Sequence, residues 1–356
     1  MINKYNKEAK FDFACILTTG RTGSDFLQGC LDGMTGVITF SGEIPFYAFL
    51  KDKKTKEFFQ EKNSKKLIKH FVKKHPNLFF KDKLENKVIN LNIKKFYRIF
   101  DELSNEIDFN RKNFFINIYL SYHLTLNRKI FKKNIIVHHS HSVEETEYFC
   151  KDFDKTKVLV TLRHPFQNLK SGIINWIKYD IRKNNFHHFY LYVRRIREDL
   201  IFALKKKSFF VKLEEMHLKK TKKKICKFLN INYTSKIHTA TFANKPWKSD
   251  KLSSFNSKNG IFNKNVLREN WKSFFSKNDE IILSYLYRDY VKFNYNIKKT
   301  SYSDKFLIII LMFLPLNYER KNLISILFSN SIFLIPKNIY YYFRRIAYYL
   351  RVYLVN

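Results

Sequence analysis

The chain has 356 residues, which is enough for one large domain with a substantial core, or for a domain with an appendage. It carries 67 Lys and Arg against 31 Asp and Glu. The resulting formal net charge of +36 favours an anionic partner: a nucleotide, a nucleic acid, an acidic glycan or a membrane surface. The N-terminal residues are charged, and no stretch reaches the roughly 18 apolar residues of a membrane span, so we expect neither a cleavable signal peptide nor a membrane-spanning helix.

The four cysteines show no spacing typical of disulfides or metal ligands. Cys15, Cys30, Cys150 and Cys226 are scattered along the chain, which predicts buried thiols in a reducing compartment. We therefore expect a cytoplasmic location, with peripheral attachment to the inner face of the membrane as an option.

The first predicted unit of structure is a strand, a glycine turn and a helix. "FDFACILTT" (11–19) is an apolar run typical of a buried strand. After the turn, Phe26, Leu27, Cys30 and Leu31 recur at helical spacing and predict the buried face of a helix. Residues 51–133, rich in Lys, Asn and Phe, predict helices with charged outer faces that form a variable layer.

Further strands alternate with helices along the middle of the chain. "NIIVHHSHS" (134–142), "KVLVTL" (157–162) and "SFFVKLEEM" (208–216) predict strands, and Pro165 is suited to the first turn of the helix that follows the second of them. "KKICKFLNI" (223–231) predicts a further helix. This alternation predicts an α/β fold with a doubly wound parallel sheet and ligands at the carboxyl ends of its strands.

Residues 298–356 differ from the rest of the chain. They are apolar and aromatic, interrupted by Pro315, Pro336 and basic patches, and each apolar piece is too short to span a membrane. We expect a helical C-terminal extension that packs on the domain or on a second subunit, with a basic-aromatic anchor on a membrane surface as the alternative.

Two motifs indicate phosphate binding. Gly20 and Gly23 stand directly before the first predicted helix, where backbone N–H groups and the helix dipole can meet a phosphate. Arg163 follows a predicted strand, and Ser171 lies eight residues later on the next helix. A guanidinium with a hydroxyl suits a second phosphate, while an Arg paired with an acid at the sheet edge is the structural alternative.

These motifs resemble those of sulfotransferases that use 3′-phosphoadenosine 5′-phosphosulfate (PAPS), of the bacterial glycan or tyrosylprotein type. In that P-loop-like family a Lys/Arg-Ser-Gly-Thr/Ser-Thr loop binds the 5′-phosphosulfate, and a strand-end Arg with a Ser eight residues on binds the 3′-phosphate. "RTGSD" and "RHPFQNLKS" are similar to these, and "CLDGMTGVITFSGE", "VKLEEM", "KPWKSDKLSS" and "LRENWKSFFSKNDEIILSYLYRDYVKFNY" resemble further segments in family order. The resemblance covers roughly residues 11–297 and implies a sulfotransferase domain over 1–297.

The resemblance implies a set of donor-binding residues. Arg21 would contact the transferred sulfonyl group, and Phe26 either stacks on the adenine or belongs to the core. Asp25 departs from the usual Thr, so we expect its carboxylate to cap the helix or to bind a substrate or Lys. Lys264, with Arg268 as a second candidate, matches a late basic contact to the 3′-phosphate. The full implied set is Gly20, Arg21, Thr22, Gly23, Ser24, Asp25, Phe26, Arg163, Ser171, Lys264 and Arg268.

The acceptor must lose a proton, and two candidates for the base remain open. Glu43 follows the loop helix in "SGE", and His141, with His139 beside it, ends a predicted strand. His138 is expected to be an inward-facing core histidine. Three histidines within four residues raise a metal site as an alternative, but no Cys or carboxylate cluster accompanies them, so we expect no metal.

We therefore expect transfer of a sulfonyl group from PAPS by in-line displacement to a hydroxyl or amine acceptor, most simply a glycan, leaving 3′,5′-adenosine bisphosphate (PAP). A P-loop kinase would need a Lys before the loop Ser and an Asp at a strand end. In this chain Arg21 precedes the loop glycine instead, and Arg163 follows the strand. A basic polyanion- or membrane-binding protein without catalysis is the other alternative, with no specific nucleic acid expected.

Overall fold

The computed structural model describes residues 9–80, 91–105, 108–178, 186–249, 259–268, 270–300, 302–320 and 334–355. The chain divides into two compact units: the first contains residues 1–18, 23–161 and 206–267, and the second contains 19–22, 162–205 and 268–356. The second unit joins the C-terminal residues with the helices that follow Leu162, and the domain boundary expected at residue 297 stays a prediction.

The first unit is built on a five-stranded parallel sheet with the strand order β2-β3-β1-β4-β5, which confirms the predicted α/β class. β1 lies in the middle and pairs in parallel with both β3 and β4. The strands are β1 (Lys10–Leu17), β2 (Val37–Ile38), β3 (Lys133–Ser140), β4 (Lys157–Leu162) and β5 (Phe209–Lys212). β1, β3 and β4 are close to the ranges expected from the sequence, β5 is shorter than the expected 208–216, and β2 was not predicted.

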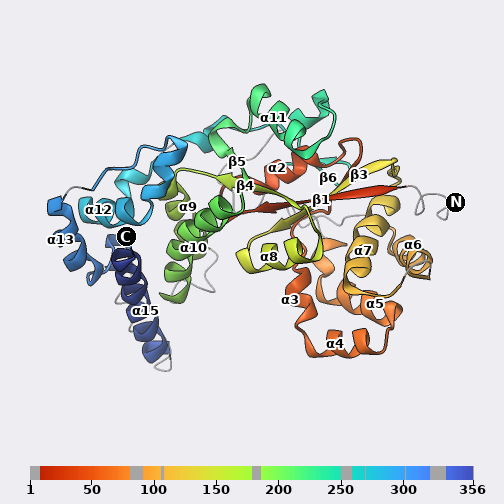
Figure 1. Ribbon diagram of the computed structural model, residues 1–356, viewed down its shortest axis with the longest axis horizontal. Coiled ribbons are helices and arrows are strands. Elements are labelled where there is room, and N and C mark those ends of the chain that lie inside the picture. The colour runs from red at the N-terminus through yellow and green to blue at the C-terminus, as the bar shows by residue number, and fades with distance from the viewer. Residues whose placement is uncertain are drawn as a thin grey trace. The chain divides into compact units, whose positions relative to one another are not determined.

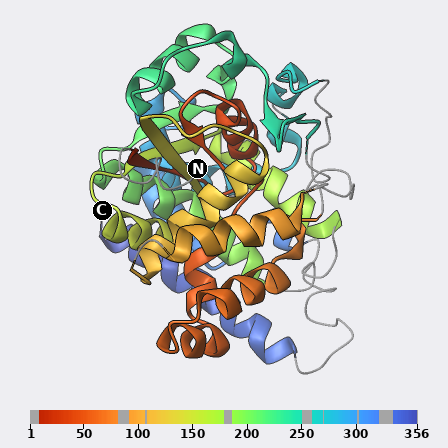
Figure 2. The same ribbon diagram turned by 90° about the vertical axis from the view of Figure 1, so that its right-hand side faces the viewer.

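Alternate residues of the strands point into two separate cores, as the two-residue period of a strand requires. Ala14 and Ile16 of β1 face a core shared with α2 (Ser24–Leu31) and α11 (Lys219–Leu229), whereas Cys15 faces the opposite layer. Figures 1 and 2 show α2 and α11 on one side of the sheet, with the other helices of this unit on the other side. These are α3 (Phe46–Leu50), α4 (Lys53–Gln60), α5 (Ser64–Lys74), α6 (Ile93–Asn105), α7 (Arg111–Thr125) and α8 (Val143–Asp152).

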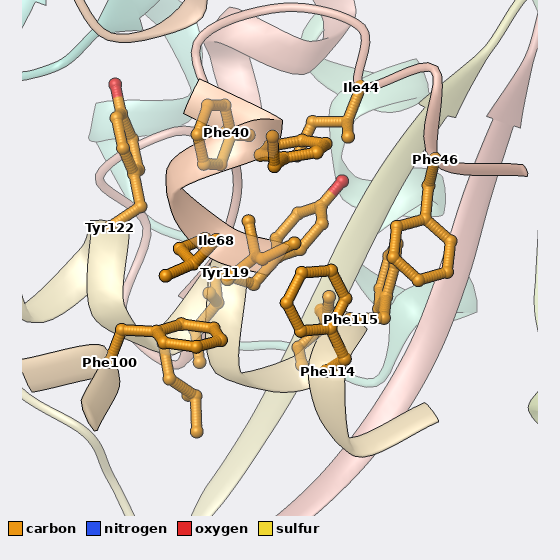
Figure 3. Packing of buried hydrophobic residues seen from close by; sticks show 14 of the residues in the cluster. Phe40, Ile44, Phe46, Ile68, Phe100, Phe114, Phe115, Tyr119 and Tyr122 are labelled. Carbon is orange, nitrogen blue, oxygen red and sulfur yellow. The ribbon is translucent and has the colours of Figure 1, made fainter. Parts of the chain in front are cut away.

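The helices within 51–133 contribute an aromatic core as well as a charged layer. α4 has the expected charged outer face, but α7 is buried along most of its length. Phe114, Phe115 and Tyr119 of α7 pack among aromatic side chains from other elements, including Phe46 and Phe40 (Figure 3). Such rings bury a large apolar area, so this layer stabilises the sheet in addition to any role beside a substrate.

Where the structure describes it, the second unit is mainly helical. Pro165 opens its first helix as predicted, and Leu169 and Ile173 lie on the buried face, while the side chains of Trp176 and Ile177 fall outside the described residues. In the described part of the chain, no helix is both long and apolar enough to cross a membrane. The helices are α9 (Pro165–Lys178), α10 (Phe186–Lys205), α12 (Lys277–Leu286), α13 (Tyr302–Met312) and α15 (Leu334–Leu354).

All four cysteines are free thiols, as the sequence predicts. Cys15, Cys30 and Cys226 are buried, and Cys150 is partly exposed. Burial raises the pKa of Cys226 to about 11, so this thiol stays protonated and unreactive near neutral pH.

Candidate functional site

The turn between β1 and α2 adopts left-handed backbone at three positions: Gly20 (φ 88°), Arg21 (φ 57°) and Gly23 (φ 82°). Glycine tolerates this conformation, whereas a residue with a Cβ adopts it only when surrounding contacts hold it there. Non-glycine residues in such strained conformations cluster at ligand-binding loops. Thr19–Thr22 belong to the second compact unit, and the chain enters the first unit at Gly23.

In the second unit, side chains of α9 and α10 hold the backbone of this turn. The Tyr192 hydroxyl lies 3.1 Å from the carbonyl oxygen of Gly20 and 2.8 Å from Oδ1 of Asn168, and can donate its proton to either. Asn168 in turn donates from Nδ2 to the Thr19 hydroxyl over 3.0 Å. A tyrosine and an asparagine that no motif singled out therefore position the predicted loop.

Gly172 makes room for that tyrosine. It follows Asn168 by one turn of α9, and a Cβ built on it would lie 2.3 Å from Cε1 of Tyr192. Real Cβ atoms essentially never approach another heavy atom so closely, so the ring can occupy this place only beside a glycine.

The two motifs predicted to bind phosphates contact each other in the second unit. Arg163 donates from Nη1 to the carbonyl oxygen of Arg21 over 3.3 Å, and Arg21 donates from Nε to Oγ of Ser171 over 3.3 Å. Arg21, Arg163 and Ser171 are all partly exposed. Two guanidinium groups, a hydroxyl and left-handed loop backbone form a donor set that fits phosphate or sulfate oxygens.

In the first unit, Gly23 precedes the start of α2 as its N-cap. A Cβ there would lie 2.5 Å from Cδ1 of Leu213 and 3.1 Å from Sδ of Met216, and the positive φ would strain any other residue. Thr22 and Ser24, expected to help bind the donor, are buried on either side of it. Gly23 offers no side chain to cap the helix, an arrangement that helices use to receive anions.

The side chain of Asp25 lies close to a buried histidine, and its expected role in capping the helix or in binding a substrate or Lys stays a prediction. It lies in the first turn of α2, where a carboxylate is favoured by the helix dipole, with Oδ1 3.7 Å from Nδ1 of His139 on β3. The same Nδ1 lies 3.1 Å from Oε1 of Gln28, and the His139 ring is fully buried. The carboxylate is thus directed toward a histidine.

Phe26 belongs to the core, which is one of its two expected roles. Its side chain is 3 % exposed and packs against the rings of Trp247 and Phe262, with centroids 5.5 and 5.1 Å away. An adenine could stack on it only after these rings had moved.

The two candidate bases lie together in the first unit. Oε2 of Glu43 is 3.7 Å from Nε2 of His141, and Oε1 of Glu43 accepts a hydrogen bond from the backbone N–H of His141 over 3.3 Å. Each side chain is about a third exposed, so both can be reached from solvent. The ring centroids of His141 and His139 lie 4.9 Å apart, and His139 in turn lies close to Asp25, so the four side chains form one group.

A further carboxyl group lies near this pair. The pKa of Glu145, on α8, is raised from 4.5 to about 7, mainly by burial and in part by the charge of Glu43, against the opposing effect of a hydrogen bond from the Ala48 N–H. Glu145 therefore changes its charge near neutral pH, close to the candidate base.

His138 is the inward-facing core histidine that was expected. Its ring is fully buried, its Nδ1 lies 3.0 Å from the hydroxyl of Tyr119, and it stacks on Phe149. Burial lowers its pKa to about 3, so the ring is neutral. No group of three His, Cys, Asp or Glu side chains within the described ranges is arranged to hold a metal.

Lys264 and Arg268 are both exposed. Burial, followed by the positive charge of Lys264, lowers the pKa of His217, which indicates that the two side chains are near each other. Their assignment to the 3′-phosphate stays a prediction. The expected substrate loop "KPWKSDKLSS" lies outside the described residues from residue 250 onward.

No family model matches the chain, and no curated protein matches it. Among solved structures, it is similar to a sulfotransferase domain from the olefin synthase of Synechococcus PCC 7002, at 14% identity, covering 74% of this chain and 85% of that one with a TM-score of 0.41. It is also similar to a sulfotransferase domain from the curacin biosynthetic pathway, at 15% identity, covering 82% of this chain and 100% of that one with a TM-score of 0.44. These likenesses are too distant to carry residue roles to this chain.

Proposed function

We propose that the chain is a sulfotransferase that takes a sulfonyl group from PAPS and transfers it to a hydroxyl or amine acceptor. The observation that carries the proposal is the pair of contacts from Arg21 to Ser171 and from Arg163 to the backbone of Arg21. Two motifs about 140 residues apart, each expected to bind one phosphate of the donor, are in direct contact. A pairing of Arg163 with an acid at the sheet edge would not require this arrangement.

The proposal gives each residue of this set a task. PAPS supplies the activated sulfonyl group and a phosphate leaving group when it is bound. Arg21 would neutralise charge on the phosphosulfate, and Arg163 with Ser171 would hold the 3′-phosphate through charge-assisted hydrogen bonds. The left-handed turn, held by Tyr192, would present N–H groups to the same anion without rearrangement.

Glu43 and His141 would remove the acceptor proton as a pair. With Oε2 and Nε2 only 3.7 Å apart, a proton taken by one group is stabilised by the other, whichever makes the first contact. This replaces a choice between the two residues with a shared role. The pair is partly exposed, as a base must be to reach an incoming hydroxyl.

A glycan is the acceptor we propose, and an acidic one in particular. The net charge of +36 and the exposed lysines of α4 and α5 would attract an extended anionic chain. This part of the proposal rests on charge, and an acceptor screen of sulfated or carboxylated oligosaccharides beside neutral sugars and phenols tests it separately from the donor.

The donor is tested by calorimetric titration of the full chain with PAP, ATP and GTP. We expect micromolar binding of PAP without added metal, weaker binding of ATP and GTP, and at least a hundredfold loss of PAP affinity in Arg163→Ala. Arg98→Ala is the matched control, because Arg98 is an exposed arginine of α6 whose ion pair with Glu102 lies within its own helix. Tighter, Mg²⁺-dependent binding of ATP or GTP would overturn the proposal in favour of a kinase.

The base is tested by steady-state kinetics once an acceptor is found. Glu43→Gln and His141→Asn should each lower kcat by about 10² to 10⁴ while leaving PAP affinity within a fewfold of wild type. The double variant should lose little more than the worse single variant, because residues that act as one unit are not additive. Full additivity of the two effects would show independent roles.

A further inference from the structure

α13 carries an apolar face that no described element covers completely. Five large side chains lie on α13 and on the two residues that directly follow it, and the three most exposed are Phe306 (72%), Phe313 (51%) and Ile310 (48%). Leu307 and Leu314 continue the same face. Contiguous exposed apolar side chains of this size mark an interaction surface rather than ordinary scatter.

α15 adds a row of positive charges beside further exposed apolar groups. Lys337, Arg344 and Arg351 recur every seven residues, about two helical turns, and all three are exposed. Tyr340 and Phe343 lie beside this row and are 56% and 63% exposed. The sequence of α15 contains no Asp or Glu, so nothing on this helix neutralises the row.

Buried contacts join α15 to the C-terminal end of α13. Arg345 and Glu319 form a fully buried ion pair, and Arg345 also donates to the carbonyl oxygens of Met312 and Leu314 at the end of α13. The Tyr342 hydroxyl donates to the Phe313 carbonyl over 2.6 Å. Arg345 is therefore used inside the unit, whereas Lys337, Arg344 and Arg351 are exposed.

We propose that this apolar-basic surface, formed by α13 and α15, attaches the protein to anionic membranes. The apolar side chains would enter the boundary between headgroups and acyl chains, and the cations would lie at the level of the lipid phosphates. Tyr340 is suited to this boundary because its ring is apolar and its hydroxyl is polar. Attachment of this kind requires no membrane-spanning helix and goes beyond the proposed catalytic function.

The charge pattern favours a lipid surface over a second copy of the chain. In a symmetric dimer the same patch meets itself, so the row of Lys337, Arg344 and Arg351 would approach an identical patch that offers no exposed carboxylate from α15. The one acid of α13, Asp304, is only partly exposed at the start of that helix. Anionic headgroups supply the missing negative charge.

The test is flotation of the full chain with vesicles of phosphatidylcholine alone or mixed with phosphatidylglycerol. We expect binding to the mixed vesicles, weakened as salt is raised, and little binding to phosphatidylcholine. Reversal of the row in Lys337→Glu/Arg344→Glu/Arg351→Glu should lower the partition coefficient at least roughly tenfold. The matched control Lys53→Glu/Lys54→Glu/Lys56→Glu makes the same charge change on the exposed face of α4 and should lower it less than about threefold.

The apolar face is tested by Phe306→Ser/Phe313→Ser against Phe131→Ser/Val291→Ser, which removes two exposed apolar side chains elsewhere. Only the first pair should weaken vesicle binding, and the melting temperature measured by circular dichroism should be unchanged in both pairs.

An equal loss of vesicle binding in the two charge-reversal variants would overturn the proposal, because the net charge of the whole protein would then be responsible for binding. A dimer in sedimentation velocity that the first pair dissociates without changing vesicle binding would overturn it in favour of self-association. Neither outcome bears on PAP binding, so the attachment and the catalytic proposal fail independently.

Discussion

Arg21 adopts a left-handed backbone conformation that its Cβ disfavours, and the contacts around it explain how it does so. Such a residue costs roughly 1 kcal/mol or more in conformational energy. The hydrogen bonds from Arg163 to its carbonyl and from its own Nε to Ser171, with the Tyr192 hydroxyl at the neighbouring Gly20 carbonyl, offset that cost. The loop is thereby set in one conformation before a ligand arrives.

Gly172→Ala tests this arrangement. The new Cβ would come within 2.3 Å of the Tyr192 ring, so the ring must move away and release the Gly20 carbonyl. We expect PAP affinity to fall roughly tenfold or more, measured by titration below the melting temperature. Tyr192→Phe keeps the ring and removes only the hydroxyl, so its loss should be smaller, about fivefold. An alanine variant with wild-type affinity would show that the ring does not position the loop.

Glu145 predicts a pH dependence of stability. Its pKa is raised by burial from 4.5 to about 7, so folding favours the protonated form. The stability that this group contributes is complete below pH 4.5 and is lost as the pH rises through about 7. Glu145→Gln removes the charge and keeps an acceptor for the Ala48 N–H, so it should be about 1–2 kcal/mol more stable than wild type at pH 8 and equal to it near pH 4.5.

Urea unfolding at the two pH values measures this difference. Glu144→Gln is the control, because Glu144 is a more exposed neighbour on the same helix whose contact with Lys51 lies at the surface. It should change stability little at either pH. A pH-independent effect of Glu145→Gln would contradict the assignment of a raised pKa.

At the scale of elements, the side chains at the end of β3 lie in different environments, because neighbouring residues of a strand face opposite sides of the sheet. His138 points into the aromatic core beside Tyr119, whereas His139 points toward Gln28 of α2. His141 lies just beyond the strand, where its backbone and its ring both contact Glu43. One short segment thus yields a structural histidine, a buried polar contact and a candidate base.

α15 depends on its buried ion pair. Glu319→Ala would leave the Arg345 guanidinium buried without its carboxylate, which typically costs about 3–5 kcal/mol. We expect a lower melting temperature and faster proteolysis within α15. Arg344→Ala, a change to the exposed neighbour, should alter neither. The double variant Glu319→Gln/Arg345→Met should recover most of the stability, because the unpaired charge is then absent.

At the scale of the whole molecule, the charge of +36 and the specific anion site should be separable. Retention on an immobilised sulfated polysaccharide should fall steeply as salt is raised, because many exposed charges contribute and all are screened. Arg163→Ala should leave that retention unchanged while abolishing PAP binding. If Arg163→Ala lost polysaccharide retention together with PAP binding, the PAP site and the basic surface would be one binding region.

Much of the fold follows from local pattern. The apolar runs predicted the strands β1, β3, β4 and β5, and the position of Pro165 predicted the start of α9. Such elements can be predicted because the residues that determine burial and turns lie within or next to each element. The helical nature of 51–133 was likewise predicted. The aromatic core formed by this segment was not predicted, because its many charged residues indicated exposed helices and α7 is buried.

The sequence by itself determined β1, β3, β4 and β5, the glycine turn, and the two motifs at Arg21 and Arg163 with the hydroxyl of Ser171 eight residues on. Only the tertiary structure decided that these motifs touch, that Tyr192 reaches the turn from 172 residues away, and that Glu43 and His141 form a pair across 98 residues. It also placed Phe26 in the core. The reason is physical: a strand or helix is specified by the spacing of nearby side chains, whereas contacts between distant segments depend on how the finished elements pack together.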